Sequence, residues 1–418
     1  MRSVFSGVVG LLVRFLIVAV CGFLTMQTIR IARADWLAAH PPADGIDKAL
    51  DLVPEDAALL LRKALSQSES GDMSPAVDQQ LLRAAAVNPL NADIPMALGL
   101  REEFRGHIAS AERYLEHAAE LDHTFKPAWT LINFYARNNE PDKTWPLIAQ
   151  ALALDPVGFN PTPIFDLAWN QAADEGKVTA LIPTQGTIPV KYLIYLLTTK
   201  RTNAAINFWP RALAAGAGNV ASPEAQALAQ YPDFLIAANR VPEAVRGWND
   251  LVAKKIVASG RLDPSTGISI ADPNFDFPLL SYSFGWRAGM EKGLFVETNP
   301  SLLRFQLDGN EPEASSVLLT TLVPLLPGKA YRLVWKSDGS GLSAPRDPGF
   351  VFRIIQQPGE SATECPPLLV AGDDGACGFT ALTGASYARL ELRYGRALGT
   401  PRVQGSLGMI SVRVEPVS

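Results

Sequence analysis

Histidine and cysteine are scarce in this chain of 418 residues, which contains four histidines and three cysteines. His117 and His123 are six residues apart, whereas two metal ligands on one face of a helix are usually about four apart. The sequence has no Cys-x-x-Cys pair, a common element of zinc and redox sites. We therefore expect no metal site and no cofactor.

Recognisable catalytic motifs are also missing. The chain has no Gly-x-Ser-x-Gly nucleophile elbow and no phosphate-binding loop. Carboxylate pairs such as Glu102-Glu103 are adjacent in sequence, whereas a glycosidase needs two carboxylates that face each other across a sugar at about 5–10 Å. Such a pair can come from distant positions. We expect a protein that is not an enzyme, with a glycan-active enzyme as the alternative.

Charge is low as well, because 19% of the residues are charged and the net charge is −5. No basic run and no basic patch with interleaved aromatic residues occurs, so we expect no nucleic-acid partner. A hydrophobic content of 48% is enough for two well-packed cores and excludes a disordered chain.

The N-terminus, in contrast, has a long apolar run. From Val4 to Ile29 the only charged residue is Arg14, and a membrane-spanning helix needs about 20 mostly apolar residues. We therefore predict a transmembrane anchor or signal segment at residues 1–34. Ala32-Arg33-Ala34 resembles a signal-peptidase site but lies well past the apolar core, and the residues before Cys21 match a lipoprotein box poorly. A retained anchor is favoured.

A short phrase recurs four times along the next part of the chain, as Val53-Pro54, Asn88-Pro89, Asp122-His123 and Asp155-Pro156. The successive spacings are 35, 34 and 33 residues, and a period near 34 is typical of stacked helix-turn-helix units. Such units bury a continuous core between neighbours and leave a concave face free for partners.

The second unit has large and small residues where two packed helices need them: Leu98, Gly99, Gly106, Ala111, Leu115 and Ala118. Small residues let two helices approach closely, and the leucines fill the space between them. This pattern resembles the tetratricopeptide repeat over about residues 48–156. The resemblance implies a solenoid that holds a protein partner, which the sequence does not identify, on its concave face.

Later repeats are less regular. The third unit replaces the turn glycine with Asn138-Asn139, and residues 192–214 align with 231–253 at a constant offset of 39. We predict that the helical region covers residues 35–262, with one helix near 164–175 between the two sets. Four tryptophans are expected to pack between helices rather than line a ligand groove: Trp129, Trp169, Trp209 and Trp248.

The pattern changes after residue 260 to short segments of alternating apolar and polar residues. Six of them predict strands: 303–307, 316–323, 330–336, 350–355, 388–394 and 408–414. Period-two alternation between regular turn signals favours an antiparallel β-sandwich at residues 263–418.

Motif order in this region resembles that of jelly-roll carbohydrate-binding modules. Asn274-Phe275-Asp276-Phe277 comes first, Gly285-Trp286 follows, and Pro327-Gly328 then precedes Tyr331. The resemblance implies a jelly roll and raises the possibility of sugar binding. Candidate ligand contacts are Tyr282, Trp286, Trp335, Asp308 and Asn310. Asp373 and Asp374 could hold calcium, but a plain solvated turn is the favoured interpretation.

Cys365 and Cys377 enclose a turn-rich loop that suits closure by a disulfide. A disulfide implies an oxidising compartment, and two free thiols in an intracellular protein are the alternative. Together with the apolar N-terminus, the disulfide favours a bacterial inner-membrane protein with one span and most of the chain in the periplasm.

The sequence as a whole predicts a multidomain α + β protein with an N-terminal transmembrane helix, a solenoid and a jelly roll. Its expected role is a membrane-anchored, exported scaffold. The solenoid would hold a protein, and the sandwich would contact envelope polysaccharide or another protein, with a role accessory to polysaccharide synthesis or export. A further alternative is an assembly factor whose sandwich is only a structural cap on the repeats.

Overall fold

A computed structural model describes the chain in two compact units, Met1–Phe159 and Asn160–Ser418. The predicted boundaries at residues 34/35 and 262/263 stay predictions. The residues described are 2–39, 44–156, 158–172, 174–290, 293–310, 315–343, 349–368, 374–395 and 402–417.

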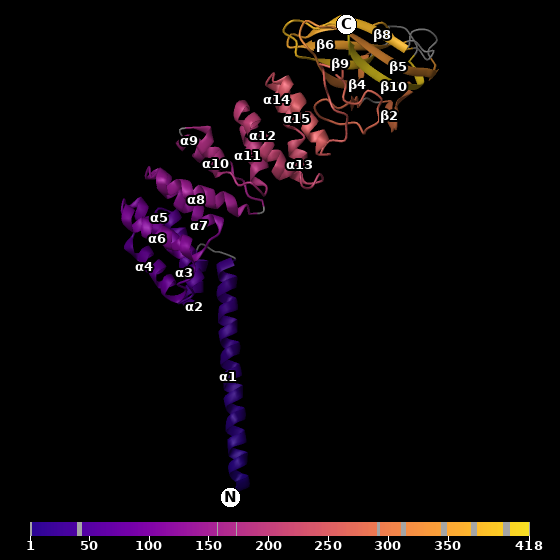
Figure 1. Cartoon of the computed structure of the whole chain (residues 1–418). Coiled ribbons are helices and arrows are strands. Elements are labelled where there is room, and N and C mark those ends of the chain that lie inside the picture. The colour runs from indigo at the N-terminus through magenta and orange to yellow at the C-terminus, as the bar shows by residue number, and fades with distance from the viewer. Residues whose placement is uncertain are drawn as a thin grey trace. The chain divides into compact units, whose positions relative to one another are not determined.

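The first unit contains helices and no strand among its described residues (Figure 1). From α3 onward the helices pair as hairpins, α3 with α4, α5 with α6, and α7 with α8, which confirms the predicted tetratricopeptide-like solenoid. The helices are α1 Arg2–Ala39, α2 Gly45–Leu52, α3 Ala57–Glu69, α4 Pro75–Val87, α5 Asp93–Phe104, α6 Ile108–Leu121, α7 Phe125–Arg137 and α8 Pro141–Leu154.

Small residues set the distance between α5 and α6. A β-carbon on Gly99 would lie 2.7 Å from Cγ of Leu115, so only glycine fits there without displacing that leucine. Ala111, Leu115 and Ala118 are the buried residues of α6. Because they recur at helical spacing, one stripe of α6 is buried against its neighbours. This agrees with the roles predicted for the small residues.

A residue in the left-handed conformation ends the first helix of each hairpin. Gly106 has a φ of 80° and Asn139 a φ of 57°, so asparagine takes the place of glycine in the third repeat. In both turns the next residue donates its N–H across the helix end: His107 to the carbonyl of Glu102, and Glu140 to that of Tyr135, each at 2.9 Å. These bonds satisfy carbonyls that the helix end would otherwise leave unpaired.

The C-terminal part of α1 belongs to the solenoid. Ala34 and Ala38 are buried in one cluster with Ala49 of α2 and Leu59 of α3, and Arg30 donates to the carbonyl of Leu52 at 2.6 Å. Residues 13–39 are long and apolar enough to cross a membrane or to serve as a signal sequence. One helix therefore contains both the apolar run and the first helix of the packed array.

The second unit begins with seven helices, α9 Thr162–Gln171, α10 Glu175–Leu181, α11 Ile188–Thr198, α12 Thr202–Gly216, α13 Pro223–Leu228, α14 Tyr231–Ala237 and α15 Val241–Ala253. The predicted helix near 164–175 corresponds to α9. The 39-residue echo is confirmed as two hairpins, α11 with α12 and α14 with α15. Their turns contain Lys200 and Asn239, again with positive φ and 39 residues apart.

The tryptophans of the helical region differ in how deeply they are buried. Trp209 is buried and stacks on Tyr231 with ring centroids 3.9 Å apart, and Trp248 is also buried. Trp169 is only half-buried, as is Trp129 in the first unit. Packing between helices, as predicted, therefore accounts for Trp209, whereas Trp248 is buried on α15 and also contacts residues outside the helices.

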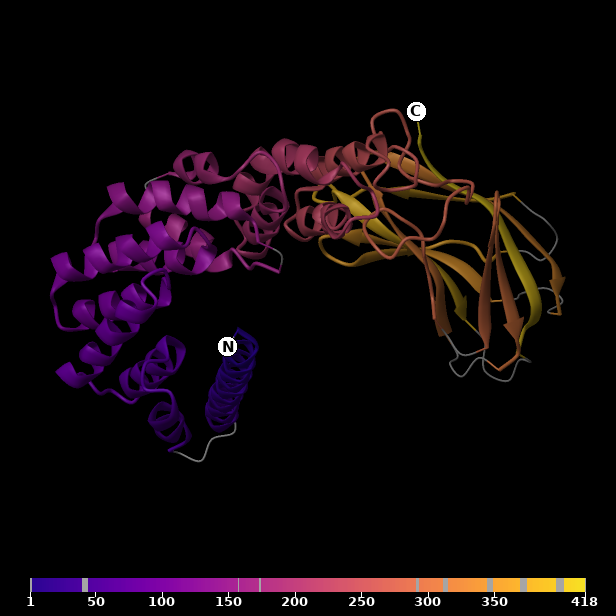
Figure 2. The same cartoon turned by 90° about the horizontal axis from the view of Figure 1, so that it is seen from below.

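The C-terminal part of the second unit is a sandwich of two five-stranded antiparallel sheets, orange to yellow in Figure 2. One sheet has the order β1-β4-β9-β6-β7 and the other β2-β3-β10-β5-β8, which confirms the predicted jelly-roll class. The strands are β1 Arg287–Ala288, β2 Leu294–Asn299, β3 Leu302–Asp308, β4 Ser315–Pro324, β5 Ala330–Leu342, β6 Phe350–Gln357, β7 Ser361–Glu364, β8 Asp374–Thr380, β9 Tyr387–Gly395 and β10 Gln404–Pro416.

All six predicted strands are present, and β1, β2, β7 and β8 were missed. Of these, β1, β7 and β8 contain few large apolar residues, so alternation does not reveal them.

In β5 the alternation is regular, with Tyr331, Leu333 and Trp335 buried. Gly375 on β8 pairs with Trp335, and a β-carbon there would lie 2.1 Å from the indole. The glycine makes room for the ring.

Helices and sandwich share a core within this unit. The Trp248 ring meets Phe284 edge-on at 5.7 Å, and its Nε1 donates to the carbonyl of Gly260 at 3.1 Å. The N–H of Ser283 donates to Asp233 of α14 at 2.8 Å. Burial raises the pKa of this aspartate, while the Ser283 N–H lowers it by a smaller amount. The sandwich is therefore packed onto α14 and α15.

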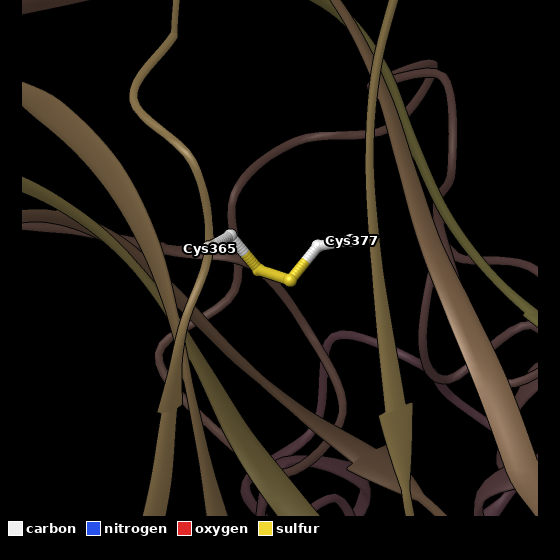
Figure 3. The surroundings of a disulfide bond; sticks show 2 residues. All are labelled: Cys365 and Cys377. Carbon is white, nitrogen blue, oxygen red and sulfur yellow. A yellow bond between two sulfur atoms is a disulfide. The ribbon is translucent and has the colours of Figure 1, made fainter.

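The predicted disulfide is present between Cys365 and Cys377, whose Cα atoms are 5.5 Å apart (Figure 3). Cys365 follows β7 in one sheet and Cys377 lies on β8 in the other. Because both residues are buried, the bond joins the two sheets inside the core, where their edge strands β7 and β8 have only one neighbour each.

We predict that changing both cysteines, as Cys365→Ser and Cys377→Ser together, lowers the free energy of unfolding of the sandwich by about 3 kcal/mol. The reason is that the open chain gains loop entropy when unfolded. Urea unfolding followed by near-UV circular dichroism measures the change, and Cys21→Ser is the matched control. Equal unfolding midpoints for the double variant and the control would contradict a stabilising role.

Candidate functional site

An apolar groove lies between α3 and α5 in the first unit. It has a volume of about 390 Å³, within the range of roughly 300–1,000 Å³ that is common for ligand sites. Three large apolar side chains on it are exposed to solvent, Leu65 by 38%, Leu100 by 42% and Phe104 by 79%. Leu65 comes from α3, and the other two come from α5, one turn apart.

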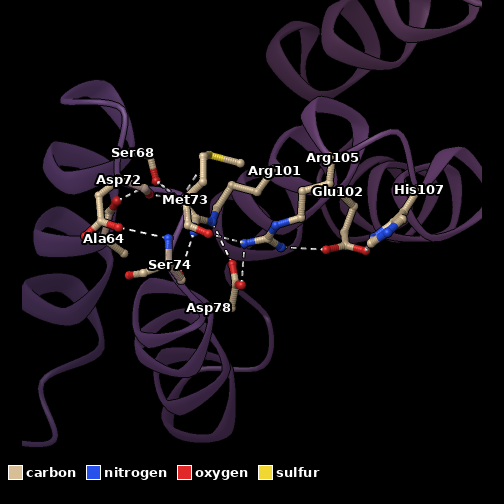
Figure 4. A network of polar contacts seen from close by, with 10 residues as sticks. All are labelled: Ala64, Ser68, Asp72, Met73, Ser74, Asp78, Arg101, Glu102, Arg105 and His107. Carbon is tan, nitrogen blue, oxygen red and sulfur yellow. Dashed lines mark hydrogen bonds and ion pairs between the residues drawn. The ribbon is translucent and has the colours of Figure 1, made fainter.

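Beneath the groove, Arg101 is held in a dense polar network (Figure 4). Only 4% of this residue is exposed. Its guanidinium donates to Asp78 at 2.6 Å, to Ser68 at 2.8 Å and to the carbonyls of Asp72 at 2.8 Å and Ser74 at 3.1 Å. A buried cation needs such partners to offset its lost hydration. The network fixes the α3–α4 loop against α5, which keeps the groove in shape.

Arg105 extends the network toward the next turn. It donates to Asp78 at 2.6 Å and to Glu102 at 2.7 Å, and the hydrogen bond with Asp78 is the main reason that the pKa of Arg105 is raised. For Glu102, burial alone would raise the pKa, but the hydrogen bonds with Arg105 and His107 together lower it. The side chains of Arg105, Asp78, Glu102 and His107 therefore bond to one another.

Ion pairs also join the first helices of adjacent hairpins. Lys126 of α7 contacts Asp93 of α5 at 2.6 Å, and Arg137 of α7 donates to both oxygens of Glu103 at 2.8 and 2.7 Å. The partners are 33 and 34 residues apart, which is the repeat length. Such a bidentate pair fixes the relative orientation of the two helices as well as balancing the charges.

We call the exposed side of α3, α5 and α7 the first-helix face.

A second depression, the sandwich hollow, has a volume of about 410 Å³ and a mainly polar lining. It lies on the outer side of the sheet β2-β3-β10-β5-β8, where Lys336 of β5, Asp374 of β8 and Arg413 of β10 meet the segment 274–276. Arg413 donates to Asn274 at 3.2 Å. The hollow thus combines cationic and anionic groups from three adjacent strands.

Of the five predicted ligand contacts, the two tryptophans belong to the core. Trp286 is 2% exposed, and its Nε1 donates to the carbonyl of Asp272 at 2.7 Å. Trp335 is 3% exposed and packs against Phe352 at 5.2 Å between ring centroids. A sugar stacks on an open ring face, so neither indole offers the platform that was predicted, although Trp335 borders the hollow.

The other three candidates lie apart from the hollow. Tyr282 is half-buried, and burial raises the pKa of its phenol, with a smaller contribution from the charge of Asp233. Asp308 and Asn310 are exposed at the end of β3, where the N–H of Asn310 donates to the Asp308 carboxylate at 2.8 Å. That bond is an ordinary turn contact. The structure therefore does not gather the predicted residues into one site.

Asp373, considered for calcium, lies outside the described residues. Asp374 is described and borders the hollow. Within the described part of the chain, no three histidine, cysteine or acidic residues are grouped so that they could hold a metal ion.

The residues that line the hollow were not predicted as a group. Lys336 directly follows Trp335, and strict alternation assigns it to the outer side. Asn274 and Asp276 stand in the motif that opens the sandwich. The pairing of β5 with β8 and β10 was not available from the sequence, because β8 has no regular apolar pattern.

Comparison with known proteins gives likeness of structure only. No family model and no curated protein matches the sequence. The chain is similar to a solved structure titled "CBM4 structure and function", with 15% identity, a TM-score of 0.26, and 36% of this chain and 100% of that chain covered.

Two solved helical-repeat proteins are also similar. For YrrB, a tetratricopeptide protein with an unusual peptide-binding site, the identity is 12%, the TM-score 0.26, and the coverage 51% of this chain and 94% of that one. For PilF of Pseudomonas aeruginosa the identity is 13% and the TM-score 0.27, with 46% of this chain and 88% of that one covered. Likenesses at this level carry no argument about function.

We predict that Arg101→Ala lowers the free energy of unfolding of the first unit by about 3 kcal/mol, because it leaves Ser68 and the carbonyls of the α3–α4 loop without their buried partner. Asp78 keeps its hydrogen bond from Arg105. Amide hydrogen exchange over residues 68–78 should become faster. The control is Arg113→Ala, since within the described part of the chain Arg113 forms hydrogen bonds only inside its own helix. The role of Arg101 would be refuted by equal exchange rates in the two variants.

Proposed function

We propose that this protein is a membrane-anchored scaffold, not an enzyme, that holds a protein partner on its first-helix face. The observation that carries the proposal is the apolar groove with exposed Leu65, Leu100 and Phe104. Large apolar side chains gathered around a groove are typical of interaction sites. The Arg101 network beneath them keeps the groove preformed, which lowers the entropic cost of binding.

The partner segment that fits this groove contributes a large apolar side chain. Polar residues that line the groove, among them Ser68 and Glu69, would contact the backbone and flanking residues of that segment. An apolar anchor with polar surroundings is the usual arrangement when a peptide or helix binds in a groove. The groove therefore favours a protein segment over a small polar metabolite.

For the sandwich we propose contact with envelope polysaccharide, and for the whole protein a role accessory to polysaccharide synthesis or export. The polar hollow supports the first part. The alternative of a structural cap is supported by the shared core around Trp248 and Phe284. The alternative of a glycan-active enzyme is supported by Asp276 and Asp374, two carboxylates that border the same hollow.

We further propose that the protein stays in the bacterial inner membrane through α1, with the solenoid and sandwich in the periplasm. The 38 residues of α1 give a length of about 57 Å at 1.5 Å per residue, nearly twice the ~30 Å of a bilayer's hydrocarbon core. The C-terminal part of that excess, from Arg30 onward, packs against α2. The buried disulfide suits an oxidising compartment.

Retention of α1 is testable on the protein in its own membrane. Cleavage after Ala34 would remove Arg30 and Ala34 from the packed first hairpin, so we expect the purified membrane protein to keep its N-terminal residues. Mass spectrometry of the intact protein and of its N-terminal peptide measures this. A mature chain that begins at Asp35 would refute the anchor.

Partner binding at the groove is testable by photo-crosslinking in intact cells. A photoreactive amino acid at position 104 should give a discrete protein adduct, and Leu100→Glu should remove it by placing a charge in the apolar groove. The control position is Leu82 on α4, which is 51% exposed and lies outside the groove. No adduct at 104, or equal adducts at both positions, would count against the proposal.

A further inference from the structure

We propose that the sandwich hollow binds an uncharged sugar ring of a glycan, with Lys336, Asp374 and Arg413 as its direct contacts. This inference rests on the proposed contact between sandwich and polysaccharide, and it assigns a site that does not include the exposed ring faces expected from the sequence.

Strand register brings the three charged residues together. Lys336 on β5 is paired with Asp374 on β8 on one side and with Ser411 on β10 on the other. Arg413 lies two residues along β10 from Ser411, in register with Val334. Residues two apart on a strand share one side of the sheet, so these polar groups form a continuous patch on its outer side.

Asn274, Asp276 and Ser301 form a further wall of the hollow. Ser301 donates to the Asp276 carboxylate at 2.6 Å, and Arg413 donates to Asn274 at 3.2 Å. The buried carboxylate of Asp272 accepts the N–H groups of Asp276 at 2.9 Å and Phe277 at 3.1 Å. The wall is therefore fixed by hydrogen bonds in the free protein.

The charged groups of the hollow are adjacent but, in the described part of the chain, form no direct ion pairs. Among the described residues, Lys336, Asp374, Asp276 and Arg413 take part in no ion pair within 4 Å, although all four line the hollow. Two are cationic and two are anionic. These four described residues thus offer strong donors and strong acceptors side by side, and their charges sum to zero.

This balance favours a neutral polar ligand over an anion or an apolar molecule. An anion would meet two cations but also two carboxylates that repel it, and an apolar ligand would remove four charged groups from water without replacing their hydrogen bonds. A sugar hydroxyl both donates and accepts, so neighbouring hydroxyls can pair with a carboxylate and an ammonium or guanidinium group at once. Hydrogen bonds to charged partners are the stronger kind.

The test uses the full-length protein in detergent and a fixed panel of probes. The neutral probes are oligosaccharides of glucose, galactose and N-acetylglucosamine, and the anionic probes are oligo-alginate and inorganic phosphate. We expect at least one neutral oligosaccharide to bind. Lys336→Ala and Asp374→Ala should each weaken that binding about tenfold or more, because each removes a charge-assisted hydrogen bond.

Matched controls are Arg304→Ala and Asp338→Ala, two exposed charged residues of the same sheet that are not part of the hollow; neither should change the affinity. Binding of the anionic probes alone, or of no probe, by a folded protein overturns the inference. Neutral binding that survives both hollow variants overturns this site and leaves the proposed polysaccharide contact standing.

Product analysis during the same titrations separates binding from catalysis. We expect no new reducing ends when the bound oligosaccharide is incubated with the protein. Reducing ends that disappear in Asp374→Asn would overturn the binding role in favour of hydrolysis. The scaffold proposal is judged independently, by the crosslink at position 104 in the first unit.

Discussion

The left-handed residue at the end of each first helix is the constraint on which the helical part of this protein depends. At Gly106, Asn139, Lys200 and Asn239 the backbone has positive φ, and the following N–H returns to a carbonyl of the last helical turn. This closes the helix end and reverses the chain within a few residues. The second helix can then pack back on the first, where small residues such as Gly99 allow close contact.

Repetition of that turn has a functional consequence. It places equivalent positions of successive first helices side by side, so Leu65 and Leu100 border one groove although they are 35 residues apart. The same regularity brings Arg137 to Glu103. Polar groups below the groove are bound to one another through Arg101, whereas the apolar groups above it have no comparable packing. That contrast between a closed network and an open apolar surface is the physical basis for proposing a protein partner.

In the sandwich the arrangement is reversed: its tryptophan rings are buried, and the charged residues of the hollow lie on the outer side of one sheet. Its tryptophans hold the core, with Trp286 bonded to a backbone carbonyl and Trp335 seated over Gly375, and the disulfide joins the two sheets beside them. In the hollow, Lys336, Asp374 and Arg413 lie close together without forming ion pairs to any described residue. The proposed recognition there would rely on hydrogen bonds, because the rings of Trp286 and Trp335 are buried in the core.

Sequence alone determined the helical repeats, the jelly-roll class, six strands and the disulfide, because period, alternation and cysteine spacing are local patterns that one dominant packing satisfies. The sequence predicted that Asn139 lies in the turn of the third repeat. It did not predict that Arg101 is buried at the groove. It offered Trp286 and Trp335 as candidate ligand contacts, whereas both are buried in the core. For Trp335 on β5, alternation tells which residues share a side of the sheet but not which side faces inward. Only the tertiary structure decided that Lys336, Asp374 and Arg413 meet, because strand order joins residues that are far apart in the chain.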